Sequence, residues 1–351
     1  MPNMVRGFCK EWLFLLHMQP NKNIKIFINY FLGPLLFAWL AYSIYRQIVR
    51  QPQLGASWLH IRSSFRSVQV LYLVGAIALI PANWGLETLK WQLSVRRIYP
   101  VSFVQAFKAV LAGVSFSVTM PNRVGDYLGR MMYLPEGSRL RTISVTLVGS
   151  CAQLIVTLVA GTFGLLMLKD TLLQQLPHYY VLSQFIIYGL VLASILGLVL
   201  YFQASAAAGL FRRWTRAEKY FYLVDALNDF DRRLLWQVLL LSLLRYFVFL
   251  VQYIFIFYLF DVNVPPVTIM LVMSIVFLAM AIVPSIALIE VWLRGKIMLL
   301  LVGIFSANTL GTGLASVTVW FLNLIVPAIA GSLLLLNLRV FRRKNARDTS
   351  T

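Results

Sequence analysis

Forty-two consecutive residues without a charged side chain, from position 297 to position 338, constrain this chain more than any other feature. As a single helix they would extend about 63 Å, which is about twice the hydrocarbon thickness of a bilayer. The chain must therefore turn back inside this run, and the polar sequence SANTLGTG is the best candidate for the turn. Other uncharged apolar runs, each long enough to cross a bilayer, precede it in the sequence.

The composition agrees with a membrane protein. Hydrophobic residues make up 60% of the 351 residues and charged residues only 12%, whereas a soluble domain has about 25% charged residues. We therefore predict an all-α, polytopic integral membrane bundle of about eight spans, some of them broken or re-entrant. The apolar runs before the uncharged stretch place these spans at residues 26–45, 68–86, 101–120, 142–168, 180–201, 234–260 and 267–283.

The second run has Trp84 near its end, and Glu87, Lys90 and Trp91 follow it, with Arg96 and Arg97 a little further on. Tryptophan and basic residues are typical of the membrane–water interface. We therefore interpret this segment as the exit of the second span into water.

The predicted organisation is one membrane domain, residues 26–339, with two pseudo-repeated halves at 26–202 and 234–339. A polar segment, residues 1–25, precedes it, and a basic tail, residues 340–351, follows it. The linker 203–233 is expected to be an amphipathic surface helix. The chain has 31 Lys and Arg against 12 Asp and Glu, and the positive-inside rule places the linker and the tail in the cytoplasm. The orientation of the N-terminus stays open.

Two similar motifs interrupt the apolar pattern, one in each half. Pro121 precedes Asp126, and Arg130 follows four residues later. In the second half Pro284 precedes Glu290, and Arg294 again follows four residues later. An acid with an arginine four positions on lies on one helix face in the favourable order for an ion pair. Matching interruptions in two halves of a transporter indicate broken helices that meet near the middle of the membrane.

These motifs have more than one interpretation. An arginine and a helix N-terminus aimed into a cavity would make an anion site, but both motifs could instead be loops at the interface. Gly125 and Gly129 have the spacing of a close helix–helix contact. Arg245 lies about twelve residues inside its span, where a charge needs either a polar cavity or a structural partner such as Glu290.

The sequence PNRVGDYLGR resembles the P-x-R-x-G-E-x-x-R segment of the lysylphosphatidylglycerol synthase membrane region, the flippase-like domain family. The later PSIALIE and the long span after it resemble a second segment of that family. The resemblance extends over about residues 26–339 and implies a bundle with re-entrant segments that moves polar lipids between leaflets. By position it carries roles over to Pro121, Arg123, Gly125 and Asp126, and to Pro284 and Glu290.

The sequence departs from the family pattern in three ways. Asp126 stands where the pattern has Glu, and Arg130 comes one position late. No residues after Arg339 could form the aminoacyl-transferase domain of the full synthase, so we do not expect synthesis of lysyl-lipid.

The leading functional prediction is a lipid translocase of the bacterial cytoplasmic membrane. Its partner would be a phospholipid or another amphiphilic lipid, with a polar cavity lined by Arg123, Asp126, Arg245 and Glu290, and with Arg130 and Arg294 beside them. The sequence has no G-x-x-x-x-G-K-[ST] loop, so transport would be passive or coupled to an ion gradient. We expect no cofactor, metal or nucleic acid.

Two other functions remain open. An integral-membrane transferase acting on a lipid-linked substrate would use Asp126 or Glu87 as its base. A small-solute or ion carrier could be built on the same broken-helix plan.

Overall fold

The computed structural model describes residues 59, 63, 68–119, 124–135, 139–175, 180–203, 230–283 and 287–334. The first predicted span, the basic tail and most of the linker lie outside these residues. Pro121, Arg123 and Pro284 also lie outside them.

All regular structure in this part of the chain is helical, which confirms the predicted fold class. Five of the helices are long and apolar enough to cross a membrane: α5, α8, α9, α12, and α15 with its continuation to Leu334. The helices are α5 (Val70–Val95), α6 (Phe103–Thr119), α7 (Val124–Met131), α8 (Arg139–Gln175), α9 (Tyr180–Phe202), α12 (Arg232–Leu259), α13 (Pro266–Ile282), α14 (Ala287–Val302) and α15 (Thr309–Trp320), which continues through a π-helical turn, η6 (Phe321–Ile325).

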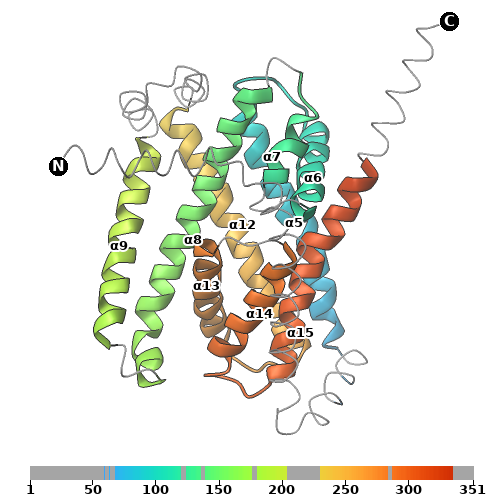
Figure 1. The fold of residues 1–351 in the computed structure, drawn as a ribbon. Coiled ribbons are helices and arrows are strands. Elements are labelled where there is room, and N and C mark those ends of the chain that lie inside the picture. Colours follow the sequence, from blue (N-terminus) through green and yellow to red (C-terminus); the bar gives the residue numbers. More distant parts are fainter. Residues whose placement is uncertain are drawn as a thin grey trace, which may run out of the picture.

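Two pairs of shorter helices enter the bundle from opposite ends (Figure 1). Helices α6 and α7 occupy the end where α5 finishes, and α13 and α14 occupy the end where α12 finishes. Helices α6 and α13 each have 17 residues, about 25 Å of helix, and α7 has 8 residues, about 12 Å. Helices α6 and α13 end near the middle of the bundle, and α7 and α14 begin there.

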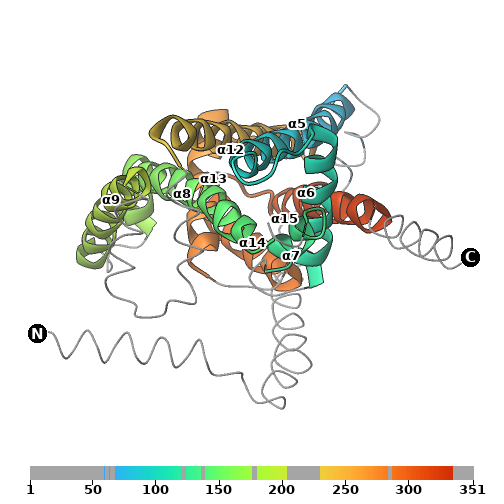
Figure 2. The ribbon, with the colours of Figure 1, turned by 90° about the horizontal axis from the view of Figure 1, so that it is seen from above.

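The described chain is an inverted repeat. In each half a long helix is followed by a pair of shorter helices and then by another long helix: α5 to α8, and α12 to α15. Helices α5 and α12 run in opposite directions and pack along each other, as the view from above also shows (Figure 2). Corresponding contacts recur in the two halves, because α7 packs on α8 as α14 packs on α15.

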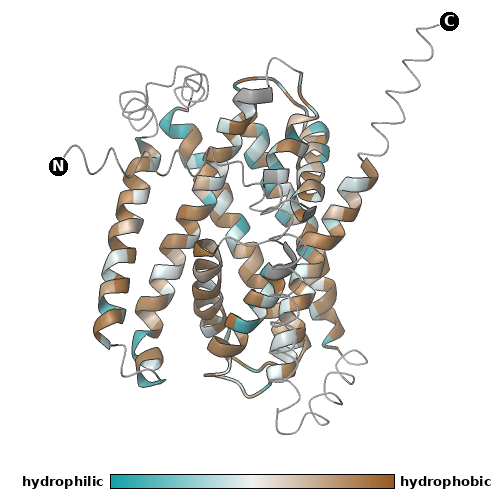
Figure 3. Cartoon of the chain, viewed as in Figure 1, coloured by the Kyte–Doolittle hydropathy of each residue, from teal (hydrophilic) through white to brown (hydrophobic). Residues whose placement is uncertain are grey.

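The outer surface of the bundle is suited to lipid. Apolar residues cover most of α9, which packs mainly against α8 at the edge of the bundle (Figures 2 and 3). Phe185 is 72% exposed and Tyr188 is 68% exposed on this helix. In a bilayer such side chains face acyl chains, so their exposure is consistent with a membrane-spanning helix.

The predicted turn in the uncharged run is confirmed. Helix α14 ends at Val302 and α15 begins at Thr309, inside the sequence SANTLGTG. The Asn308 side chain caps the new helix by accepting a hydrogen bond from the Gly311 backbone N–H at 2.8 Å. The predicted end of the second span was wrong, because α5 continues nine residues beyond Leu86, to Val95.

Helices α6 and α7 touch backbone to backbone. A Cβ atom at Gly129 would lie only 2.5 Å from the Cα of Gly113, and one at Gly125 would lie 2.5 Å from the backbone nitrogen of Ser117. Only glycine allows this approach, so the Gly125–Gly129 spacing marks a close helix contact. Gly125 therefore has a packing role, and the role in binding that the sequence resemblance gave it stays a prediction.

We expect Gly129→Ala to lower the free energy of unfolding by about 1–3 kcal/mol, because the added carbon meets backbone atoms that cannot rotate away. Gly85→Ala is the matched control. No atom lies within 4 Å of its added carbon, and it should raise stability by about 0.5–1 kcal/mol. Reversible unfolding by SDS in mixed micelles measures both changes. Equal stability of the two variants would contradict the close packing of α6 on α7.

Candidate functional site

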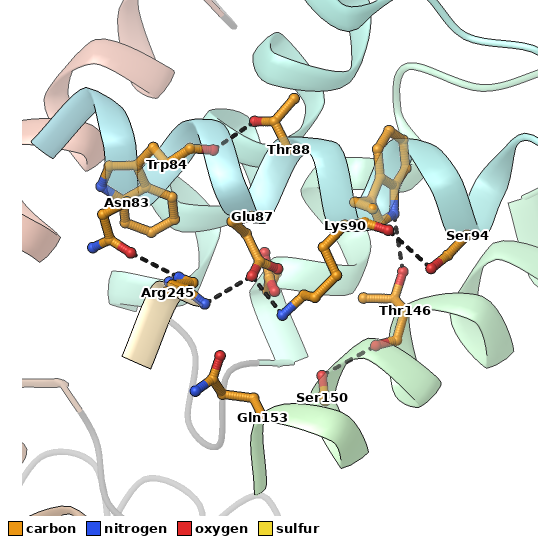
Figure 4. Close-up of polar contacts among 12 residues, drawn as sticks. Asn83, Trp84, Glu87, Thr88, Lys90, Ser94, Thr146, Ser150, Gln153 and Arg245 are labelled. Carbon is orange, nitrogen blue, oxygen red and sulfur yellow. Dashed lines mark hydrogen bonds and ion pairs between the residues drawn. The ribbon is translucent and has the colours of Figure 1, made fainter. Parts of the chain in front are cut away.

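Helix α5 carries a stripe of polar side chains on its buried face. Asn83, Glu87, Lys90 and Ser94 follow one another at helical spacing, and each is at most 5% exposed. The interpretation of Glu87 and Lys90 as an exit into water is therefore wrong. Both residues lie inside the bundle, where other helices supply charged partners (Figure 4).

Glu87 binds three cations. Its Oε2 atom accepts from Lys90 Nζ at 2.7 Å and from Arg245 Nη1 at 2.7 Å, and its Oε1 atom accepts from Arg130 Nη2 at 2.9 Å. These cations come from α5, α12 and α7. A single carboxylate therefore links a helix from each half of the repeat to the shorter helix α7.

Arg130 also binds Asp126, one turn earlier on α7. Its Nε donates to Oδ1 at 3.0 Å and its Nη2 donates to Oδ2 at 2.8 Å, so the contact is bidentate. The ion pair predicted from the first motif is thus present, and it is joined to Glu87. The Asp126 side chain is 21% exposed and that of Arg245 is 13% exposed, whereas those of Arg130 and Lys90 are only 4% exposed.

A line of uncharged polar groups continues from Arg245 and crosses between the two halves of the repeat. Arg245 Nε donates to Asn83 Oδ1 at 2.8 Å, and Asn83 donates to Asn323 Oδ1 at 2.8 Å. Asn323 in turn donates to Gln252 Oε1 at 2.6 Å, and Gln252 donates to the Ala76 carbonyl. Asn323 lies in the π-helical turn of α15, a local geometry that is often found at functional sites.

Lys90, Arg130 and Arg245 contribute three positive charges to this cluster, and Glu87 and Asp126 contribute two negative charges. We call these five residues the charged cluster. It has one excess positive charge when all five groups are ionised. Charges at membrane depth cost about 2.5–3.5 kcal/mol each on insertion scales, so they persist where they are paired and functional.

The second motif lies apart from the charged cluster. Glu290, in the first turn of α14, pairs with Arg294 one turn later, as the sequence predicted. Arg294 lies beside the fully buried Tyr253, which is eight residues, or about 12 Å, further along α12 than Arg245. Arg245 forms an ion pair with Glu87 on α5, and the suggested pairing with Glu290 stays a prediction.

The structure thus brings together Asp126, Arg130 and Arg245 from the predicted set, while Glu290 and Arg294 form a separate pair. Asn83, Gln252 and Asn323 were missed, Lys90 was assigned to the membrane interface, and Glu87 was considered as an interfacial residue or as a base. The spacing of Asn83, Glu87, Lys90 and Ser94 was the available signal, since it puts four polar residues on one helix face.

The fold and the buried cluster define a polytopic membrane protein with two inverted pairs of broken helices. The family model described as the lysylphosphatidylglycerol synthase TM region matches residues 27–289, so the chain belongs to this family. It is therefore a membrane protein of lipid-related function. No curated protein and no solved structure matches the chain.

Proposed function

We propose that this protein is a lipid translocase of the bacterial cytoplasmic membrane, with its linker and basic tail on the cytoplasmic side. The polar head group would pass along the charged cluster while the acyl chains stay in the surrounding lipid. The observation that carries this proposal is the position of the cluster. Five charged side chains meet inside a bundle whose long helices have the length and composition of membrane spans.

The positions of the shorter helices favour a lipid whose head group is anionic or zwitterionic. Helices α7 and α14 begin inside the bundle, and the N-terminus of a helix favours negative charge. Asp126 and Glu290 lie in the first turns of these helices, where they interact with both the helix dipole and an arginine. A lipid phosphate would compete with these carboxylates and with Glu87 for the same guanidinium groups.

The two most exposed members of the charged cluster, Asp126 and Arg245, mark the side from which a head group would arrive. The absence of a phosphate-binding loop in the sequence leaves passive movement or coupling to an ion gradient as the driving force.

A transferase is less well supported. Glu87, one of the two candidate bases, has both carboxylate oxygens bound to cations. A carboxylate held in this way is a poor proton acceptor, because its cations stabilise the ionised form. No observation favours the small-solute carrier over the lipid translocase.

Photo-crosslinking tests the proposed path. Phosphatidylglycerol with a diazirine on its head group, and the same lipid with the diazirine at the end of an acyl chain, are each irradiated with the protein in nanodiscs. The head-group probe is expected to label the interior faces of α5, α7 and α8, and the acyl probe the outer face of α9 around Phe185 and Tyr188. The same labelling pattern from both probes would contradict the proposal.

A further inference from the structure

The Lys90 ammonium group has hydrogen-bonding capacity that its partners leave unused. An ammonium carries three N–H donors. In the described part of the chain, the Lys90 Nζ atom has one polar contact, to Glu87 Oε2 at 2.7 Å. The side chain is only 4% exposed. Buried donors without acceptors are destabilising, so a buried ammonium with two open donors indicates a missing acceptor.

Lys90 lies against a polar face of α8. Its Cε atom would be 3.4 Å from a Cβ atom added at Gly149, so glycine at this position leaves room for the end of the lysine side chain. Ser150 follows Gly149 directly, and Gln153 lies one turn further along the same helix. Gln153 extends from α8 toward the side of Glu87 and Arg245 (Figure 4). The Gln153 Oε1 atom is buried and has no hydrogen-bond partner among the described residues.

Ser150 connects this region to the outside of the bundle. Its residue surface is exposed, and its hydroxyl lies 3.4 Å from that of Tyr127 on α7. The Ser150 hydroxyl also donates to the Thr146 carbonyl at 3.1 Å. Ser150, Gln153 and Lys90 thus place polar groups between the exposed surface of α8 and the charged cluster.

We propose that Lys90, Gln153 and Ser150 form a subsite for the phosphate of the transported lipid, with Lys90 as the residue that selects phosphate-bearing lipids. This inference rests on the proposed translocase function and adds the residues that recognise the phosphate. Phosphate oxygens accept hydrogen bonds from the open Lys90 donors, and lysine binds phosphate well as a compact charge. The negative charge also balances the one excess positive charge of the cluster.

The test compares two lipids with the same fluorescent acyl chain in proteoliposomes: phosphatidylglycerol and an uncharged glucosyl diacylglycerol. Dithionite quenching of the outer leaflet gives the leaflet-exchange rate of each lipid. The wild type is expected to exchange the phosphate lipid at least about tenfold faster than the glycolipid. Lys90→Gln should reduce this ratio by about tenfold, which is the loss typical of one charge-assisted hydrogen bond.

Lys108→Gln is the matched control, because Lys108 is an exposed lysine on the neighbouring helix α6 and should leave the ratio unchanged. Lys90→Arg should retain most of the preference. Gln153→Leu is a second test of the subsite, and it leaves the ion pairs of the charged cluster intact. It removes a buried polar atom without a partner, so it should be at least as stable as the wild type and still lower the ratio.

The ratio separates recognition from stability, since a merely structural role would slow both lipids equally. Equal rates for the two lipids in the wild type, or an unchanged ratio in both Lys90→Gln and Gln153→Leu, would overturn the subsite and leave the translocase standing. Exchange of neither lipid by the wild type would overturn the proposed function and the subsite with it.

Discussion

Glutamine in place of Glu87 is expected to lower the free energy of unfolding by about 3–5 kcal/mol, the range for removing one partner of a buried ion pair. The amide keeps the shape of the side chain but leaves Lys90 and Arg245 without their carboxylate, and Arg130 with Asp126 alone. Reversible unfolding by SDS in mixed micelles, followed by tryptophan fluorescence, measures the change.

Asp170→Asn is the control for this prediction, because it makes the same chemical change at an exposed position of α8. It should stay within about 0.5 kcal/mol of the wild type. If Glu87→Gln were as stable as Asp170→Asn, Glu87 would not hold the three helices together.

A double-mutant cycle isolates the interaction of Glu87 with Lys90. Glu87→Gln combined with Lys90→Met removes one negative and one positive charge, so the double variant should be more stable than the sum of the two single losses predicts. The sign of this coupling energy distinguishes a lost ion pair from a general loss of packing.

Arg245→Gln is expected to slow leaflet exchange of phosphatidylglycerol by about 100-fold, because the head-group phosphate would lose two hydrogen bonds from a charged group, each contributing about 1.5 kcal/mol or more. In the structure these guanidinium donors bind Glu87 and Asn83, and the phosphate would take the place of these acceptors on the proposed path. The guanidinium also lies 5.3 Å from the ring centroid of Trp84, and it is the most exposed cation of the charged cluster.

The matched control is Arg97→Gln, which changes an arginine that is also paired with a carboxylate but is 52% exposed, outside the cluster. It should exchange lipid at the wild-type rate, because an exposed ion pair contributes little to stability and lies off the proposed path. Arg245→Lys should lose much of the activity, because lysine keeps the charge but lacks the planar group that bridges two acceptors. Wild-type exchange in Arg245→Gln would remove Arg245 from the transport path.

Hydropathy was sufficient to predict most of the spans. Helices α9, α12 and α13 begin and end within two residues of the predicted runs, because each run is bounded by charged or turn-forming residues. The two proline motifs predicted that α7 and α14 begin with an acid and an arginine on one face. Both features depend only on residues a few positions apart, and a single sequence is enough to recognise such spacing.

The charged cluster could not be predicted in the same way. Arg130 lies 43 residues from Glu87 in the sequence, and Arg245 lies 158 residues from it. Beside two tryptophans, Glu87 has the local signature of an interface, and only these distant arginines make its burial favourable. The polar stripe on α5 indicated a buried polar face, but it did not identify the partners.

Leaflet exchange by the wild-type protein tests the proposed function most directly. Fluorescent phosphatidylglycerol is incorporated into vesicles with and without the purified protein, and dithionite then quenches the label in the outer leaflet. With the protein present, we predict that label from the inner leaflet also becomes accessible, and that Arg245→Gln slows this phase while Arg97→Gln does not. An inner-leaflet pool as protected as in protein-free vesicles would contradict the assignment of the charged cluster to lipid movement.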